Sequence, residues 1–287
     1  MIRWSLPGRD IWRIGLVEAP IAEVARRGFP FDAPVHWLPE EGRLKFVADP
    51  FGVWADGRLL LFAEAYDYRT RHGVIELIEL GADFSPMRRS VVLRESWHLS
   101  YPQVFAADGD WWMIPEAHRS GALTLYRATA FPHRWEPVVR LALDTPAIDA
   151  TPFRHEGLWW LAYSPAGPQR WKQGRLHFAF AERLTGPWRP HSGNPVRNAL
   201  ASSRPGGTAW LENGFPRLPV QDCTRSYGGA LRVLKILELS PQRFEAEASA
   251  PLLPPSSAGA YRHGLHTLSA CGPVTLFDVK RVDRSPW

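Results

Sequence analysis

Short runs of hydrophobic residues alternate along the chain with tight polar turns, and the clearest pair of runs spans residues 46–66. The two runs flank Asp56-Gly57, a dipeptide that favours the positive φ angles of a two-residue hairpin turn. Because an antiparallel hairpin returns both strands to the same end, Asp49 and Glu64 should lie side by side there. Two carboxylates at one strand end are unusual in a hydrophobic core. This end of the hairpin is therefore a candidate site.

The same hairpin layout returns four more times before the C-terminus. In each copy, the residue eight positions before the turn glycine should lie beside the residue seven positions after it. We call these the first and second special positions of the repeat. The first positions are Asp49, Tyr101, Asp149, Gly206 and Gly264, and the second positions are Glu64, Glu116, Ser164, Gln221 and Val279. A strand repeat of about fifty residues is typical of propeller blades. We predict an all-β, five-bladed β-propeller with repeats that start near residues 46, 98, 146, 201 and 263.

The two ends of the chain predict how the ring closes. The last repeat has only two clear strands, over residues 265–270 and 274–282, whereas complete repeats carry a third strand and usually a fourth. Two further strands, over residues 12–19 and 35–38, precede the first repeat and are separated by a short helix or loop. We predict that residues 1–39 complete the fifth blade, because closure removes exposed sheet edges.

Composition agrees with this architecture and limits the function. Residues 1–287 are expected to form a single domain, and 14 Trp and 27 Pro suit short strands joined by tight turns. The net charge of +5 comes without a long basic run, so we expect no nucleic-acid partner. Cys223 and Cys271 stand in unrelated contexts, as is typical of reduced thiols in the cytoplasm. The N-terminus has no apolar stretch long enough for a signal peptide or a membrane helix, so we expect a cytoplasmic protein without a membrane span.

Several short motifs carry a resemblance to known proteins. They are His98-Leu-Ser-Tyr-Pro102, Met113-Ile-Pro-Glu116, Thr185-Gly-Pro-Trp188, Gln221-Asp-Cys223 and Tyr227-Gly-Gly-Ala-Leu231. With them, residues 40–283 resemble the propeller found N-terminally in plant glucosamine inositolphosphorylceramide transferases. Ala48-Asp-Pro50 and Ile148-Asp-Ala150 more distantly resemble the propeller enzymes of glycoside hydrolase families 43, 62 and 32. The resemblance implies a glycan-related role, with a transferase as a candidate partner.

The glycosidase resemblance implies roles for two acids and also contains a departure. By resemblance, Asp49 is the general base, and Asp149 orients the substrate and tunes pKa values. The general acid expected in blade four is missing, because Arg204 stands about where it should be. Glycoside hydrolysis needs two carboxyl groups and arginine stays charged, so ordinary hydrolysis is not expected unless another acid substitutes. The candidates on this face are Glu64, Glu116 and Asp222.

Other polar residues of the repeats are candidates for binding or proton transfer. Arg204 could clamp a substrate carboxylate or phosphate, or it could hold two blades together in an ion pair. Glu64 and Glu116 could equally bind strand-end amides. His98 and His266 could transfer protons or pack as hydrogen-bonded imidazoles. The candidate catalytic residues are Asp49, Asp149, Glu64, Glu116 and His98, and the candidate substrate-binding residues are Arg204, Tyr101, Gln221, Asp222 and His266.

The sequence leaves three functions open. The first is an enzyme that acts by acid/base chemistry on a sugar or another polyhydroxylated small molecule. The second is a non-catalytic propeller that recognises a glycan or glycolipid beside a transferase. The third is a biosynthetic lyase, isomerase or cyclase that reuses the acidic pore. We expect a small, polar, sugar-like ligand and neither a cofactor nor a metal, although an oxygen-rich pore also suits calcium.

Overall fold

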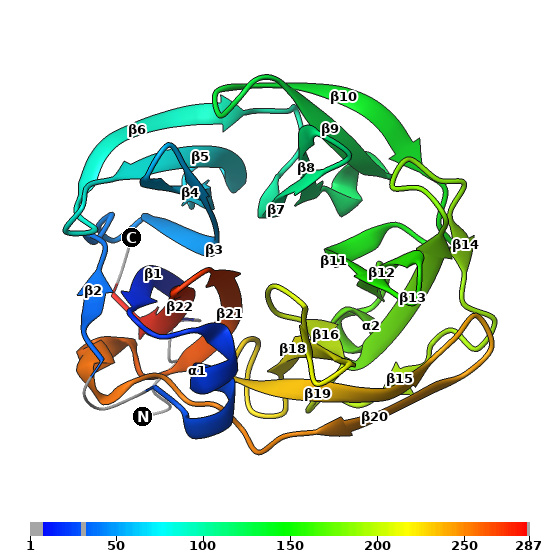
Figure 1. Cartoon of the computed structure of the whole chain (residues 1–287). Coiled ribbons are helices and arrows are strands. Elements are labelled where there is room, and N and C mark those ends of the chain that lie inside the picture. The colour runs from blue at the N-terminus through cyan, green and yellow to red at the C-terminus, as the bar shows by residue number, and fades with distance from the viewer. Residues whose placement is uncertain (1–7, 30–32, 286–287) are drawn as a thin grey trace.

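A computed structural model describes residues 8–29 and 33–285 and contains five antiparallel sheets arranged in a ring (Figure 1). Four of these sheets follow one another along the chain, and the fifth combines strands from both ends. The predicted all-β, five-bladed propeller is therefore confirmed.

The first four blades have these bounds. Blade one comprises β3 (Lys45–Ala55), β4 (Arg58–Asp67), β5 (His72–Leu80) and β6 (Pro86–Leu93). Blade two comprises β7 (Ser100–Ala107), β8 (Asp110–Glu116), β9 (Leu123–Ala130) and β10 (Arg134–Leu141). Blade three comprises β11 (Ala147–His155), β12 (Leu158–Pro165) and β13 (Arg175–Ala181), with the short β14 (Arg189–Pro190) and β15 (Arg197–Asn198) outside them. Blade four comprises β16 (Arg204–Pro205), β17 (Trp210–Glu212), β18 (Phe215–Asp222), β19 (Ala230–Leu239) and β20 (Phe244–Ala248).

The fifth blade closes the ring with strands from both ends of the chain. It comprises β21 (Gly264–Cys271), β22 (Val274–Asp283), β1 (Arg9–Val17) and β2 (Val35–Trp37). β1 pairs antiparallel with β22 along its whole length, from Arg9 opposite Asp283 to Val17 opposite Thr275. The expectation that N-terminal strands complete the last blade is confirmed. Figure 1 shows the blue N-terminal strands beside the red C-terminal ones.

In the described residues, four short helices connect the strands. α1 (Ile21–Arg27) joins β1 to β2, and the 3-10 helix η2 (Ser256–Tyr261) precedes β21. The 3-10 helix η1 (His118–Ser120) and α2 (Gln169–Gly174) lie in the connections between the second and third strands of blades two and three. These two connections lie at the same end of their blades and supply part of the site described below.

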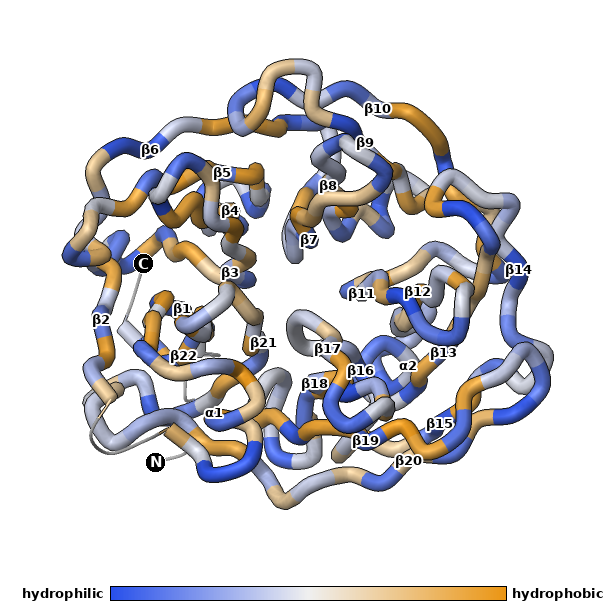
Figure 2. The backbone as a smooth tube through the Cα atoms, in the orientation of Figure 1, coloured by the Kyte–Doolittle hydropathy of each residue, from blue (hydrophilic) through white to orange (hydrophobic). Residues whose placement is uncertain are grey.

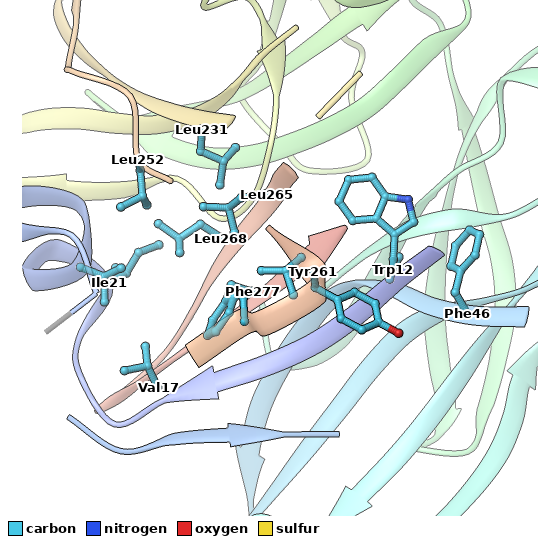
Figure 3. Packing of buried hydrophobic residues seen from close by; sticks show 14 of the residues in the cluster. Trp12, Val17, Ile21, Phe46, Leu231, Leu252, Tyr261, Leu265, Leu268 and Phe277 are labelled. Carbon is cyan, nitrogen blue, oxygen red and sulfur yellow. The ribbon is translucent and has the colours of Figure 1, made fainter. Parts of the chain in front are cut away.

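Hydrophobic residues recur along the strands (Figure 2). The buried ones form clusters shared by neighbouring blades. The cluster in Figure 3 joins the N-terminal segment to blades four and five: Trp12 and Val17 come from β1, Ile21 from α1, Leu231 from β19 and Phe277 from β22. Burying one large apolar side chain stabilises a fold by about 1.5–3 kcal/mol. The N-terminal segment is therefore part of the hydrophobic core as well as of the sheet.

The inner strands of four blades share an irregularity that shapes the centre of the ring. The pairing register shifts between Ala48 and Phe51, between Ser100 and Gln103, between Ile148 and Thr151, and between Leu265 and Leu268. Within the first three of these bulges, Asp49, Tyr101 and Asp149 have φ angles of 52°, 47° and 52°. Bulges re-aim a side chain, and positive φ is uncommon outside glycine. The first special position in each of these three blades thus lies within a bulge of the inner strand.

The structure corrects the predicted repeat positions in blades four and five. The bulge of blade five places His266, not Gly264, at the first special position. In blade four, Arg204 pairs with Gln221, so Pro205 rather than Gly206 holds the equivalent place. The prediction failed because it assumed inner strands of constant length, whereas the inner strand of blade four breaks after Pro205. A Cβ on Gly207 would lie 1.8 Å from the carbonyl oxygen of Leu268, so glycine permits close contact with blade five there.

Candidate functional site

A cavity of about 310 Å³ opens at the centre of the ring, where the hairpins of several blades end. Six of the sequence-predicted site residues line it: Asp49, Glu64, His98, Glu116, Arg204 and His266. Trp12, Tyr227, His118 and Lys172 also line it and were not predicted. Trp12 belongs to the N-terminal segment, so closure of the fifth blade also completes the cavity wall.

Asp49 lies at the floor of the cavity and is held by its neighbours. Its Oδ1 accepts a hydrogen bond from Thr267 Oγ1 at 2.9 Å, and its Oδ2 accepts one from the amide of Tyr101 at 3.2 Å. Burial raises the pKa of Asp49 to about 7, although the nearby His266 opposes the shift. The carboxyl group can therefore change its protonation state near neutral pH.

His266 is fixed between two carboxylates and an aromatic ring. Its Nδ1 lies 2.7 Å from Oδ1 of Asp278, and its Nε2 lies 3.5 Å from Oδ1 of Asp49. The imidazole stacks on Trp12 with 3.6 Å between ring centroids. Burial opposes a positive charge on His266, but Asp278 and Asp49 outweigh burial and raise its pKa.

Asp278 is a buried site residue that the sequence analysis missed. It also accepts hydrogen bonds from the amides of Asp49 and Thr267, at 2.9 and 3.0 Å, and so ties two bulges together. The signal was present as an acid flanked by the apolar residues Phe277 and Val279 in β22. Asp49, His266 and Asp278 bring ligand atoms within 4.8 Å of one another, so these three side chains could hold a cation.

Glu64 faces the same cavity from the second strand of the first hairpin. Burial raises its pKa well above the usual value, and the negative charges of Asp49 and Glu116 add to the effect. His98 accepts a hydrogen bond from the amide of Gly73 on Nδ1, so its Nε2 carries the proton, and Nε2 lies 3.4 Å from Oε1 of Glu64. Burial lowers the pKa of His98 to about 4. The imidazole is therefore neutral at pH 7.

Glu116 occupies the corresponding position in blade two but has a different environment. Its Oε1 accepts hydrogen bonds from the amide of His118 at 2.7 Å and from the imidazole Nδ1 at 2.6 Å. Ser100 Oγ donates to Oε2 at 3.2 Å. Burial opposes ionisation, but these interactions with His118 outweigh it and lower the pKa of Glu116. Glu116 is therefore ionised at neutral pH, whereas the pKa of Glu64 is shifted in the opposite direction.

Arg204 and Asp149 form a buried ion pair at the edge of the cavity. Arg204 Nε lies 2.6 Å from Oδ2 of Asp149, and the guanidinium lies 4.9 Å from the ring centre of Tyr227. Gln221 Nε2 donates to the same carboxylate oxygen at 3.1 Å and to the carbonyl of Pro205. Burial raises the pKa of Asp149, and the positive charge of Arg204 opposes that shift. Asp149 and Gln221 do not line the cavity but hold Arg204 and its strand in place.

Two other predicted residues lie outside the cavity. Asp222 accepts hydrogen bonds from Arg232 Nε at 3.0 Å and Thr224 Oγ1 at 2.6 Å, away from the other acids. Alternation along β18 explains this: Gln221 faces inward, so its neighbour faces the opposite side. Tyr101 is fully buried, and its hydroxyl bonds to Thr151 Oγ1 at 2.9 Å and to the carbonyl of Gly207 at 3.1 Å. The structure places neither residue at the cavity surface.

The position of Tyr101 predicts a structural role. Its hydroxyl also accepts a hydrogen bond from the amide of Gly207, so Tyr101→Phe would leave that buried N–H without a partner. We expect the free energy of unfolding to fall by about 1–3 kcal/mol. Chemical denaturation measures this change. An unchanged unfolding free energy would contradict the structural role, and Tyr126→Phe, which removes a part-buried hydroxyl bonded to Glu95 far from the cavity, is the matched control.

Comparison with known proteins places the chain in a family. Residues 40–260 match the family described as glucosamine inositolphosphorylceramide transferase 1, N-terminal. The chain belongs to this family. It is 38% identical to glucosamine inositolphosphorylceramide transferase 1 of Arabidopsis thaliana over 205 residues, which cover 69% of this chain and 26% of the relative. It is 33% identical to the protein of the same name from Oryza sativa subsp. indica over 217 residues, which cover 72% and 28%. The chain thus spans about a quarter of the length of these relatives.

Several solved structures with the same fold are glycoside hydrolases. An exo-β-1,3-galactanase from Clostridium thermocellum has a TM-score of 0.57 at 13% identity, with 74% of this chain and 52% of that chain covered. A family 117 glycoside hydrolase from Zobellia galactanivorans has a TM-score of 0.56 at 12% identity, with 83% and 85% covered. A family 62 α-L-arabinofuranosidase from Coprinopsis cinerea has a TM-score of 0.55 at 13% identity, with 84% and 93% covered. At these identities the likeness concerns the fold alone.

Within the described ranges, no helix has the length and apolar character needed to cross a membrane.

Proposed function

We propose that the cavity binds a sugar or a similar polyol and carries out acid/base chemistry on it. In this proposal Glu64 donates a proton and Asp49 accepts one. The observation that carries the proposal is that the two carboxyl groups of one hairpin face one cavity and that burial raises the pKa of both, that of Asp49 to about 7 and that of Glu64 well above its usual value. Carboxyl groups with raised pKa values in a shared cavity are typical of acid/base catalysts.

The environment of each acid supports its proposed role. A neutral Glu64 can accept a hydrogen bond from His98 on Oε1 and keep its own proton on Oε2 for an oxygen atom of the ligand. Asp49, with a pKa of about 7, can take a proton from a hydroxyl, a water or an acidic C–H of the ligand. Glu64 would thereby replace the acid that blade four lacks, where Arg204 is already paired with Asp149. The proton would come from blade one, so the reaction need not be ordinary hydrolysis.

Glu116 fits a binding role in the same proposal. Its carboxylate is ionised and fixed by His118, so it can accept hydrogen bonds from ligand hydroxyl groups without moving. Trp12 and Tyr227, which also line the cavity, offer aromatic surface to the apolar C–H side of a sugar. Acidic acceptors combined with aromatic rings favour a hydroxyl-rich ligand.

Recognition without catalysis is the second candidate function. The family match favours it, because the relatives are named as transferases and are about four times longer than the matched region. A propeller that presents a glycan or glycolipid to a transferase would use the same cavity. In that case the shifted pKa values would reflect burial alone.

One experiment separates the two functions. A panel of free and linked sugars is incubated with the protein in D₂O and followed by proton NMR, which detects binding, cleavage, isomerisation and proton exchange together. We expect at least one sugar to bind and react, and Glu64→Gln to keep binding while the rate falls ~10²–10⁴-fold. The matched control is Glu245→Gln on the exposed strand β20, which should behave as the wild type. Binding without reaction would favour recognition, and no binding by any sugar would contradict both.

A further inference from the structure

Three basic side chains surround the opening of the acidic cavity. Arg71 lies between β4 and β5, Arg119 lies in η1, and Lys172 lies in α2, which places one cation in the same connection of each of the first three blades. Arg71 and Arg119 are exposed and Lys172 is half-buried, whereas Asp49, Glu64 and Glu116 are buried. The cavity therefore has an acidic floor and a cationic rim, and we use "cationic rim" for Arg71, Arg119 and Lys172.

The rim cations are not neutralised by carboxylates. Within the part of the chain that the structure describes, none of the three forms an ion pair. Lys172 Nζ lies 3.5 Å from Nε2 of His118, and an ammonium group can only donate. Nε2 of His118 is therefore the acceptor, and its Nδ1 carries the proton that is donated to Glu116. The rim and the floor are thus joined through one oriented imidazole, and Lys172 keeps its charge for another partner.

We infer that the cationic rim binds a phosphate group carried by the ligand, while the hydroxyl-rich part of the same ligand occupies the acidic floor. This inference deepens the proposed function and rests on it. The three cations come from three separate connections, and a tetrahedral phosphate can offer an oxygen to each of them. A carboxylate is planar and is satisfied by one bidentate arginine. The ionised Glu116 on the floor would repel such an anion, so the charge distribution also fixes the orientation of a phosphorylated polyol.

Each residue of the cationic rim has its own role in binding the phosphate group. Arg119 and Arg71 can donate several N–H groups each, and their exposure lets them close onto a bound group. Lys172 is half-buried against His118 and supplies a fixed point charge at the boundary with the floor. A rim that only offset the charge of the floor would need no solvent-facing donors, and its loss would lower stability instead of anion binding.

The test uses inorganic phosphate as the probe, titrated at low ionic strength into the full chain and followed by calorimetry and by phosphorus NMR. We expect millimolar binding by the wild type and at least tenfold weaker binding by the double variant Arg119→Gln/Lys172→Met. Arg134→Gln/Arg140→Gln removes the same charge from the exposed outer strand β10 and should stay within twofold of the wild type. Equal weakening in both double variants, or none in either, would overturn the inference, because general electrostatics would then explain the binding.

Three further measurements complete the test. Acetate replaces phosphate as a second probe, and binding of acetate as tight as that of phosphate would overturn the assignment to phosphate. The thermal midpoint of each variant is measured, and a marked loss in the rim variant with unchanged phosphate affinity would assign the rim a structural role. Glu64→Gln should retain phosphate binding, since it lies on the floor. Glu64→Gln therefore reports on acid/base chemistry, and the rim variant reports separately on phosphate binding.

Discussion

A chain that lacks residues 1–39 should fail to form a stable, cooperatively folded propeller. The deletion removes β1, which pairs with β22 along its full length, and exposes the edge of β22 to other chains. It also removes Trp12 and Val17 from the cluster shared by blades four and five (Figure 3). At about 1.5–3 kcal/mol for each large side chain, losing several removes an amount comparable with the usual margin of stability of about 5–15 kcal/mol.

The measurement is solubility, near-UV circular dichroism and dye binding of the truncated chain, compared with the full chain. We expect an insoluble or molten product with exposed apolar surface and no sharp thermal transition. Supplying residues 1–39 as a separate chain is the control, and it should restore folding if the missing strand is the cause. A soluble, monomeric truncated protein with a sharp transition would show that residues 1–39 are an appendage.

The architecture could be predicted because its signals are local and repeated. A two-residue turn such as Asp56-Gly57 fixes the register of its own hairpin, so Asp49 and Glu64 follow directly from counting. Five copies of that layout define the ring, and the missing strands of the last copy point to the N-terminus. In blade four the inner strand breaks after Pro205, so counting misplaced the position equivalent to Asp49 by one residue. In blade five the bulge lies two residues further along the chain than the count from the turn glycine predicts.

The site could be predicted only as far as it is built from the repeat. Glu116 and Arg204 reach the cavity because they stand at strand ends inside that frame. Asp222 stands one residue beyond Gln221, and the alternation of a strand turns it away. Trp12 and Lys172 come from the closing segment and from a connecting helix, where no periodicity marks the side chain that will face the centre. Their contribution depends on the closed ring, which a single repeat does not encode.

Asp49→Asn should lower turnover of the substrate by ~10²–10⁴-fold while the protein remains folded. The asparagine can keep its oxygen toward the amide of Tyr101 and donate from its nitrogen to Thr267 Oγ1, since a hydroxyl both donates and accepts. Only the ability to take up a proton is lost. In the wild type, turnover should rise with pH through about 7, where Asp49 becomes ionised, and this rise should be absent from the residual activity of the variant.

The same substitution has a stability effect whose sign follows from the raised pKa. Because burial raises the pKa of Asp49 from 3.8 to about 7, the folded chain holds a proton that the unfolded chain has lost between these values. The favourable contribution of the protonated group is present below pH 3.8 and is lost as pH rises through about 7. The thermal midpoint of Asp49→Asn relative to the wild type should therefore be higher at pH 8 than at pH 4. Turnover that survived Asp49→Asn would exclude Asp49 as the base, whereas a fall in stability at both pH values would make its role structural.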